Sequence, residues 1–264
     1  MSMQQRTVTT KRGCEVAYLE AGSGQPLLFL HGAGGLFPQN PFLETLAGRY
    51  RVIAPWWPGY GESRGEELLE DMLDFALHGW DVVDALGLER PHLMGHSMGG
   101  MIAAEMAVTA PHDLDRLMLV CPAGLWLDEH PIPDIFSLMP YELPALLTHD
   151  PAVAMRLLAG AAELDFNNME VLKQFLVVNA RQLGTAGKIL FPIPNRRLSK
   201  RLYRLAAPTQ VLWGESDRLI VPAYAARWQA MVPHASVQRF ADCGHLVPYE
   251  QPEAFVAAVS DFLG

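Results

Sequence analysis

Short apolar runs, each followed by a turn and then by a helical pattern of apolar residues, constrain the fold of this chain more than any other feature. The runs are continuous and do not alternate between apolar and polar residues, which is typical of strands covered on both faces. They lie at residues 27–30, 52–54, 93–94, 117–120 and 211–213, and a further strand is expected around Val237. This pattern predicts an α/β fold with a mostly parallel central sheet flanked by helices.

The alternation of strands and helices stops between about residues 124 and 205. Prolines punctuate short helical stretches in this part of the chain, which is also rich in aromatic and methionine residues. We interpret residues 125–205 as a mostly helical cap, inserted between a first part of the core, 1–124, and a second part, 206–264. The large apolar side chains of the cap form its own interior, the lining of a ligand cavity beneath it, or both.

The balance of charges argues against two classes of partner. The chain has 264 residues with 20 Lys and Arg against 29 Asp and Glu, which gives a net charge of −9. Such a protein repels phosphate backbones and anionic lipid surfaces. We therefore expect a small-molecule substrate, neither nucleic acid nor a membrane as partner, and a monomer or homodimer.

The cysteines and the N-terminus bear on compartment and metal content. The three cysteines are far apart and show no metal-ligand spacing, so we expect them to be buried small apolar residues and expect no metal. The N-terminal residues lack the basic and apolar regions of a secretory signal, and no window approaches the ~20 apolar residues of a membrane span. These features predict a cytoplasmic protein.

The strongest chemical motif is GHSMGG at residues 95–100. It follows the apolar run 93–94 directly and leads into a helical stretch. Ser97 lies between Gly95 and Gly99 in the pattern GxSxG, in which small flanking residues allow a tight, strained strand-to-helix turn. This placement predicts that Ser97 is a nucleophile.

A serine nucleophile needs a base and a carboxylate, in the chain order serine, acid, histidine. The segment GESDRLI, which follows the run 211–213, offers Glu215 and Asp217, and the segment ADCGHLVPYEQP offers His245. We prefer Asp217 because it lies farther from the strand end, where the GxxD pattern favours the acid. His245 is the predicted general base.

The motif HGAGG at residues 31–35 follows another apolar run and can turn backbone amides toward one point. We expect the oxyanion hole to consist of the backbone amides of Ala33 and Met98. A phosphate-binding loop is the alternative, but neither GxxxxGK[ST] nor GxGxxG occurs. We assign packing and hydrogen-bonding roles to His31 and His96.

Four motifs stand in one order: HGAGG, PGYGES from Pro58, GHSMGG, and then Asp217 with His245. In this order the chain resembles the α/β-hydrolase fold family, in its cap-bearing serine hydrolase branch, which includes carboxylesterases and meta-cleavage product hydrolases. The motifs span essentially the whole chain. One departure is that Trp56 and Trp57 precede Pro58, where family members often carry Asp.

The resemblance implies an enzyme without cofactor. A serine at the nucleophile position argues against dehalogenase and epoxide hydrolase chemistry, which use a carboxylate there. We expect hydrolysis of carboxylic esters of small, largely apolar substrates through an acyl-enzyme. The alternative is carbon–carbon bond hydrolysis of vinylogous diketones, although those relatives usually carry Asn before the serine where this chain has His96. Lactonase, amidase or perhydrolase activity, and a non-catalytic small-ligand receptor, remain open.

Candidate pocket residues come from the cap and from the loops around the motifs. Arg181, in the cap, could bind a substrate carboxylate or lie on a helix surface. The full set of expected pocket residues is Trp56, Phe136, Met139, Phe175, Arg181 and Leu246.

Overall fold

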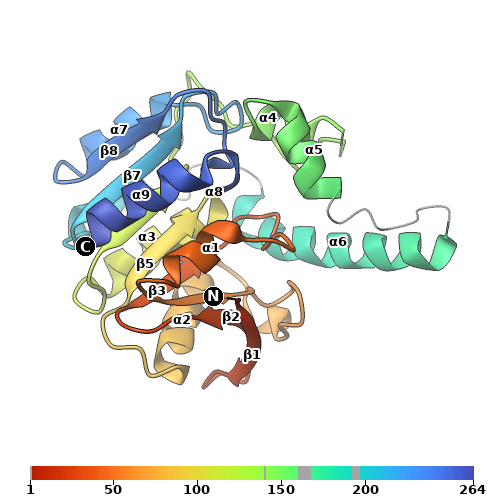
Figure 1. Ribbon diagram of the computed structural model, residues 1–264, viewed down its shortest axis with the longest axis horizontal. Helices are drawn as coiled ribbons and strands as arrows, with labels where there is room; N and C mark the ends of the chain where they lie inside the picture. The colour runs from red at the N-terminus through yellow and green to blue at the C-terminus, as the bar shows by residue number, and fades with distance from the viewer. Residues whose placement is uncertain (1, 140, 160–167, 192–196) are drawn as a thin grey trace.

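The computed structural model describes residues 2–139, 141–159, 168–191 and 197–264 and contains one eight-stranded sheet. The strand order is β1-β2-β4-β3-β5-β6-β7-β8, and every pairing from β4–β3 to β7–β8 is parallel. The α/β fold with a mostly parallel sheet is thus confirmed (Figure 1). The strands are β1 (Gln4–Thr9), β2 (Glu15–Ala21), β3 (Pro26–Leu30), β4 (Arg51–Pro55), β5 (His92–His96), β6 (Leu117–Val120), β7 (Thr209–Gly214) and β8 (Ser236–Phe240).

The first two strands were not predicted from the apolar runs. β1 pairs with β2, and β2 with β4, both antiparallel, so they form the edge of the sheet. Five of the six β1 residues are exposed, whereas every residue of β5 and β6 is buried. An edge hairpin with one face in solvent lacks the continuous apolar run of a central strand.

Helices cover both faces of the sheet and close the core. α1 packs against α9, and α2 packs against α3 (Figure 1). Eleven residues of α3 are buried, because this helix lies between the sheet and other helices. The core helices are α1 (Pro41–Leu46), η1 (Glu66–Leu68), α2 (Met72–Ala85), α3 (Met98–Thr109), α7 (Ala223–Met231), α8 (Val247–Glu250) and α9 (Pro252–Leu263).

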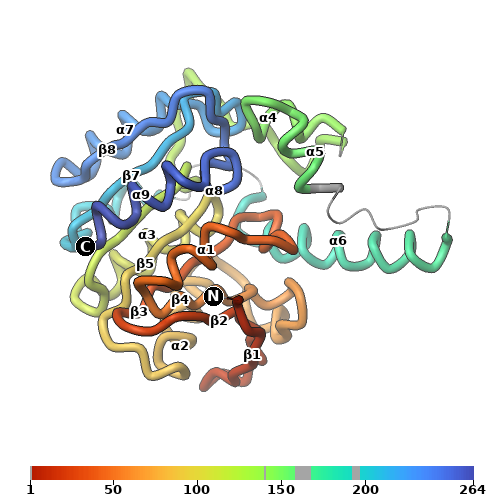
Figure 2. The backbone as a smooth tube through the Cα atoms, viewed as in Figure 1, coloured from red at the N-terminus to blue at the C-terminus, as the bar shows by residue number. Residues whose placement is uncertain are grey.

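The segment between β6 and β7 holds α4 (Leu143–Leu147), α5 (Pro151–Ala159), α6 (Met169–Leu190) and the 3₁₀ helices η2 (Leu198–Lys200) and η3 (Leu202–Arg204). The chain trace shows α4 to α6 set apart from the sheet, with α6 reaching away from the body (Figure 2). We keep residues 125–205 as the proposed extent of the cap. Within the described ranges, no helix combines the length and the apolar character needed to cross a membrane.

Candidate active site

The turn between β5 and α3 holds Ser97 in a strained backbone conformation. Its φ is 56° and its ψ is −116°, a region that residues other than glycine rarely adopt. A Cβ atom at Gly95 would collide with the Gly99 carbonyl, and one at Gly99 with the Leu30 carbonyl at the end of β3. The glycines of the motif therefore permit the backbone to pass this closely, and Ser97 itself stays partly accessible.

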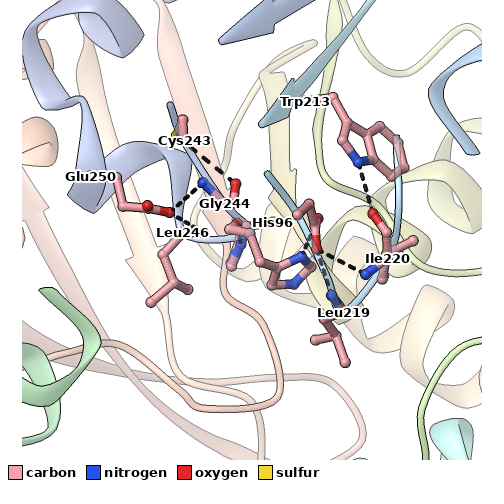
Figure 3. A network of polar contacts seen from close by, with 10 residues as sticks. His96, Trp213, Leu219, Ile220, Cys243, Gly244, Leu246 and Glu250 are labelled. Atoms are coloured by element: carbon pink, nitrogen blue, oxygen red, sulfur yellow. Dashed lines mark hydrogen bonds and ion pairs between the residues drawn. The ribbon is translucent and has the colours of Figure 1, made fainter. Parts of the chain in front are cut away.

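Asp217 and His245 follow the neighbouring parallel strands β7 and β8, so they meet at the same edge of the sheet as Ser97. His245 Nδ1 lies 2.7 Å from Asp217 Oδ2, and both side chains are buried. The other carboxylate oxygen, Oδ1, accepts from the amides of Leu219 at 2.9 Å and Ile220 at 2.8 Å (Figure 3). Glu215, in contrast, is exposed, so the loop presents Asp217 and not Glu215 to the histidine.

The second ring nitrogen of His245, Nε2, is buried and has no hydrogen-bond partner among the described residues. With Nδ1 bound to a carboxylate, Nε2 is the atom of His245 that remains to accept a proton. A buried nitrogen without a partner is costly, and in an active site an arriving group satisfies it.

His96 links the serine turn to the histidine loop. Its Nε2 donates to the His245 carbonyl oxygen at 2.9 Å, and the two rings lie 5.0 Å apart. Burial lowers the pKa of His96 to about 3, so its ring is neutral at physiological pH. The residue before Ser97 thus has the hydrogen-bonding role expected for it.

The HGAGG loop lies directly against the serine turn. A Cβ atom at Gly32 would lie 3.2 Å from the Ser97 Cβ, and Tyr60 Oη donates to the Ala33 carbonyl at 2.9 Å. His31 Nε2 accepts from the Trp57 amide at 3.2 Å, which gives this histidine a structural role. In the described parts of the chain, nothing accepts a hydrogen bond from the amides of Ala33 and Met98. Both predicted donors are therefore available.

One group of metal-ligand types gathers in the described structure: atoms of Cys121, Asp217 and His245 lie within 4.8 Å of one another. Burial raises the pKa of the Cys121 thiol, which keeps it protonated and a poor metal ligand, while the other two residues already bind each other. Sequence reasoning missed this placement. Cys121 directly follows β6, and Asp217 lies in the loop after the adjacent parallel strand β7. Because the ends of adjacent parallel strands lie together, this order in the sequence could have predicted that the two residues are close.

The expected pocket residues differ in how far they are buried. Leu246 is buried beside His245, whereas Trp56, Phe136 and Phe175 are half-buried. Met139 is 56% exposed, and its place in the pocket stays a prediction.

Arg181 pairs with a carboxylate of the core. Its guanidinium pairs with both carboxylate oxygens of Glu66, at 2.5 and 2.8 Å, and donates to the Ser63 carbonyl at 2.8 Å. The sequence left open whether Arg181 binds a substrate carboxylate or lies on a helix surface; in this structure it is half-buried, and a carboxylate of the core neutralises it.

Comparisons with known proteins agree with this architecture. A family model described as the alpha/beta hydrolase fold matches residues 25–252. The 2-hydroxy-6-oxo-6-phenylhexa-2,4-dienoate hydrolase of Comamonas testosteroni is 31% identical, over 94% of this chain and 91% of its own. A meta-cleavage product hydrolase from Pseudomonas fluorescens IP01 has a TM-score of 0.78 at 22% identity, covering 98% of this chain and 97% of that one. Naproxen esterase from Bacillus subtilis has a TM-score of 0.71 at 20% identity, covering 100% and 92%.

These matches confirm the resemblance that the motifs indicated. The family model covers all four motifs, and the relatives align over nearly their full length. The strained serine turn and the buried histidine–carboxylate pair lie within the motifs that carry this resemblance, on a mostly parallel sheet. This chain therefore belongs to the α/β-hydrolase fold family.

Proposed function

We propose that this protein is a serine hydrolase that cleaves carboxylic esters of small, largely apolar substrates through an acyl-enzyme on Ser97. One observation carries the proposal: His245 is bound through Nδ1 to buried Asp217, while its Nε2 is buried without a partner among the described residues. That arrangement suits a general base which must receive a proton during the reaction.

In the proposed cycle, Ser97 Oγ attacks the substrate carbonyl carbon while His245 Nε2 takes the hydroxyl proton. The negative oxygen that forms accepts from the amides of Ala33 and Met98, and His245 then gives its proton to the leaving alcohol. A water molecule, deprotonated by the same nitrogen, attacks the acyl-enzyme and releases the acid. Asp217 keeps the Nδ1 proton in place and stabilises the imidazolium.

The two free amides supply the electrostatic part of the mechanism. Met98 is the first residue of α3, where backbone amides have no partner within the helix. Each oxyanion donor of this kind stabilises the transition state by about 2.7–4 kcal/mol. Such donors act on any carbonyl substrate, so they support acyl hydrolysis in general and leave the choice of leaving group to the pocket.

The commitment of Arg181 to Glu66 favours a neutral substrate. A dienoate substrate carries a carboxylate, which needs a cation or several donors when it leaves water. Arg181 was the cation that sequence analysis offered for this purpose, and it is already neutralised. An ester with apolar groups on both sides makes no such demand.

Carbon–carbon bond hydrolysis is the second candidate, and the comparisons favour it. The Comamonas testosteroni relative, at 31% identity, is a hydrolase of a phenylhexadienoate. In this reading the same Ser97, His245 and amide donors act, and the leaving group is a carbon fragment instead of an alcohol.

A fluorophosphonate probe and a substrate panel test these proposals. We expect the probe to label Ser97, and p-nitrophenyl esters of short acyl chains to be hydrolysed with a higher kcat/KM than a meta-cleavage dienoate. A higher kcat/KM for the dienoate would reverse the order of the two candidates. Failure of Ser97 to label would contradict both and favour a receptor that binds without turnover.

A further inference from the structure

Glu250, the last residue of α8, binds the backbone on both sides of His245. Its Oε1 accepts from the Gly244 amide at 2.9 Å and from the Leu246 amide at 3.2 Å (Figure 3). The side chain is half-buried, and burial raises the pKa of this carboxyl. One oxygen therefore fixes two amides of the loop that carries the proposed base.

The other oxygen of Glu250 reaches the cap. Oε2 accepts from the His149 amide at 2.7 Å, just beyond the end of α4. From the same end, the Leu147 carbonyl accepts from the amides of His245 at 2.8 Å and Leu246 at 3.2 Å. Three consecutive amides of the histidine loop thus donate to Glu250 or to the end of α4.

The end of α4 also binds the loop that carries Asp217. Arg218 donates through one terminal nitrogen to the Ala145 carbonyl at 2.8 Å and to the Thr148 carbonyl at 3.3 Å. His149 Nδ1 lies 2.7 Å from Ser216 Oγ. A Cβ atom at Gly244 would lie 2.7 Å from the Thr148 Cα, so the two backbones touch. The first cap helix therefore ends between the two loops and binds both.

We propose that Glu250 is a positioning residue for the reaction: its Oε1 sets the position of His245 relative to Ser97, and its Oε2 joins that loop to the cap at His149. This inference rests on the proposed role of His245 as general base. Glu250 touches neither the substrate nor the reacting atoms, so its effect passes through the histidine.

The two oxygens can be separated by substitution. In Glu250→Gln, the amide oxygen keeps both acceptor contacts to the histidine loop, while the amide nitrogen faces the His149 N–H and cannot accept from it. In Glu250→Ala both sets of contacts are lost. Glu253→Ala, an exposed glutamate in the first turn of α9, is the matched control.

The experiment measures the rate and the final extent of fluorophosphonate labelling of Ser97, together with kcat and KM for a p-nitrophenyl ester. We expect Glu250→Ala to slow labelling and to lower kcat by about 10²-fold, the loss typical of a misplacement near 1 Å, while the final extent stays complete. Glu250→Gln should recover most of kcat, and Glu253→Ala should match the wild type.

Three results would overturn the proposal. These are a labelling rate and kcat unchanged in Glu250→Ala, a lower final extent at an unchanged rate, which indicates misfolding alone, and a Glu250→Gln variant as slow as Glu250→Ala. If Glu250→Ala does not fold, Glu250→Gln decides, since it keeps the contacts of Oε1 and a large loss of kcat in this variant would contradict the role of that oxygen. Failure of the wild type to label would instead refute the proposed function.

Discussion

Two of the places where the cap meets the core differ in what they hold. The end of α4 binds the loops of Asp217 and His245 through backbone carbonyls and Glu250. α6 binds a different part of the core, where Arg181 pairs with Glu66 and Lys188 donates to the carbonyls of Glu66 and Leu69. The first attachment holds the two loops of the proposed active site, and the second holds α6 against the core.

This difference separates two properties of the enzyme. Changes at the α4 attachment should alter the chemical step, because they move His245. Changes at the α6 attachment should alter substrate binding, because its contacts hold Glu66 and Leu69 and neither of the two loops. The variants below test that separation, beginning with the reaction itself.

The largest effect should come from Ser97→Ala. Loss of the nucleophile should lower kcat by about 10⁶-fold and abolish fluorophosphonate labelling, while circular dichroism stays native because the turn depends on Gly95 and Gly99. Ester turnover and spectra are measured on the same sample. Retained turnover with a native spectrum would remove Ser97 from the mechanism.

Asp217→Asn should follow. Because the buried carboxylate holds Nδ1 of His245, its neutralisation favours the wrong tautomer and should lower kcat by about 10⁴-fold. Exposed Glu215 provides the control, since Glu215→Gln should leave kcat close to that of the wild type. If the two variants exchanged their effects, the acid would lie two residues earlier in the chain.

Arg181→Met tests the α6 attachment. Removal of the guanidinium leaves Glu66 without its cation and loosens α6, so KM for apolar esters should rise by about fivefold, the factor that corresponds to about 1 kcal/mol. The rate of fluorophosphonate labelling should not change. Lys173→Met, at an exposed position on the same helix, is the control. A lower kcat in Arg181→Met with unchanged KM would show that the two attachments are not separate.

The sequence predicted the parts of this molecule that depend on short stretches of chain. The apolar runs located the central strands, and Ser97 directly follows β5, while Asp217 and His245 lie in the loops that follow β7 and β8. The contacts of Glu250 with His149 and of Arg181 with Glu66 join residues 101 and 115 positions apart. No local pattern reveals such pairs, because they depend on how the cap packs onto the core.

The smallest effect concerns stability in acid. The buried histidines of the core and the Glu66–Arg181 pair at the α6 attachment should lose their stabilising contributions in different pH ranges as the pH falls. Burial lowers the pKa of His31 and His78 to about 4 and that of His96 to about 3, from an ordinary value of 6.5. The unfolded chain therefore binds more protons than the native state below about pH 6.5, and the free energy of unfolding of the core should decrease as pH falls through this range.

At the α6 attachment, the hydrogen bonds from Arg181 lower the pKa of Glu66 to about 2 from an ordinary value of 4.5. A carboxylate with a lowered pKa stabilises the native state above pH 4.5, and this contribution is lost as pH falls from 4.5 toward 2. We expect the difference in unfolding free energy between the wild type and Arg181→Met to be constant from about pH 7 to about pH 5, and to shrink below that. Urea titrations of both proteins at each pH measure the difference, in which the contributions of the buried histidines cancel. A difference that begins to shrink near pH 6.5 would mean that the α6 attachment also constrains the buried histidines, and the two regions would then unfold as one unit.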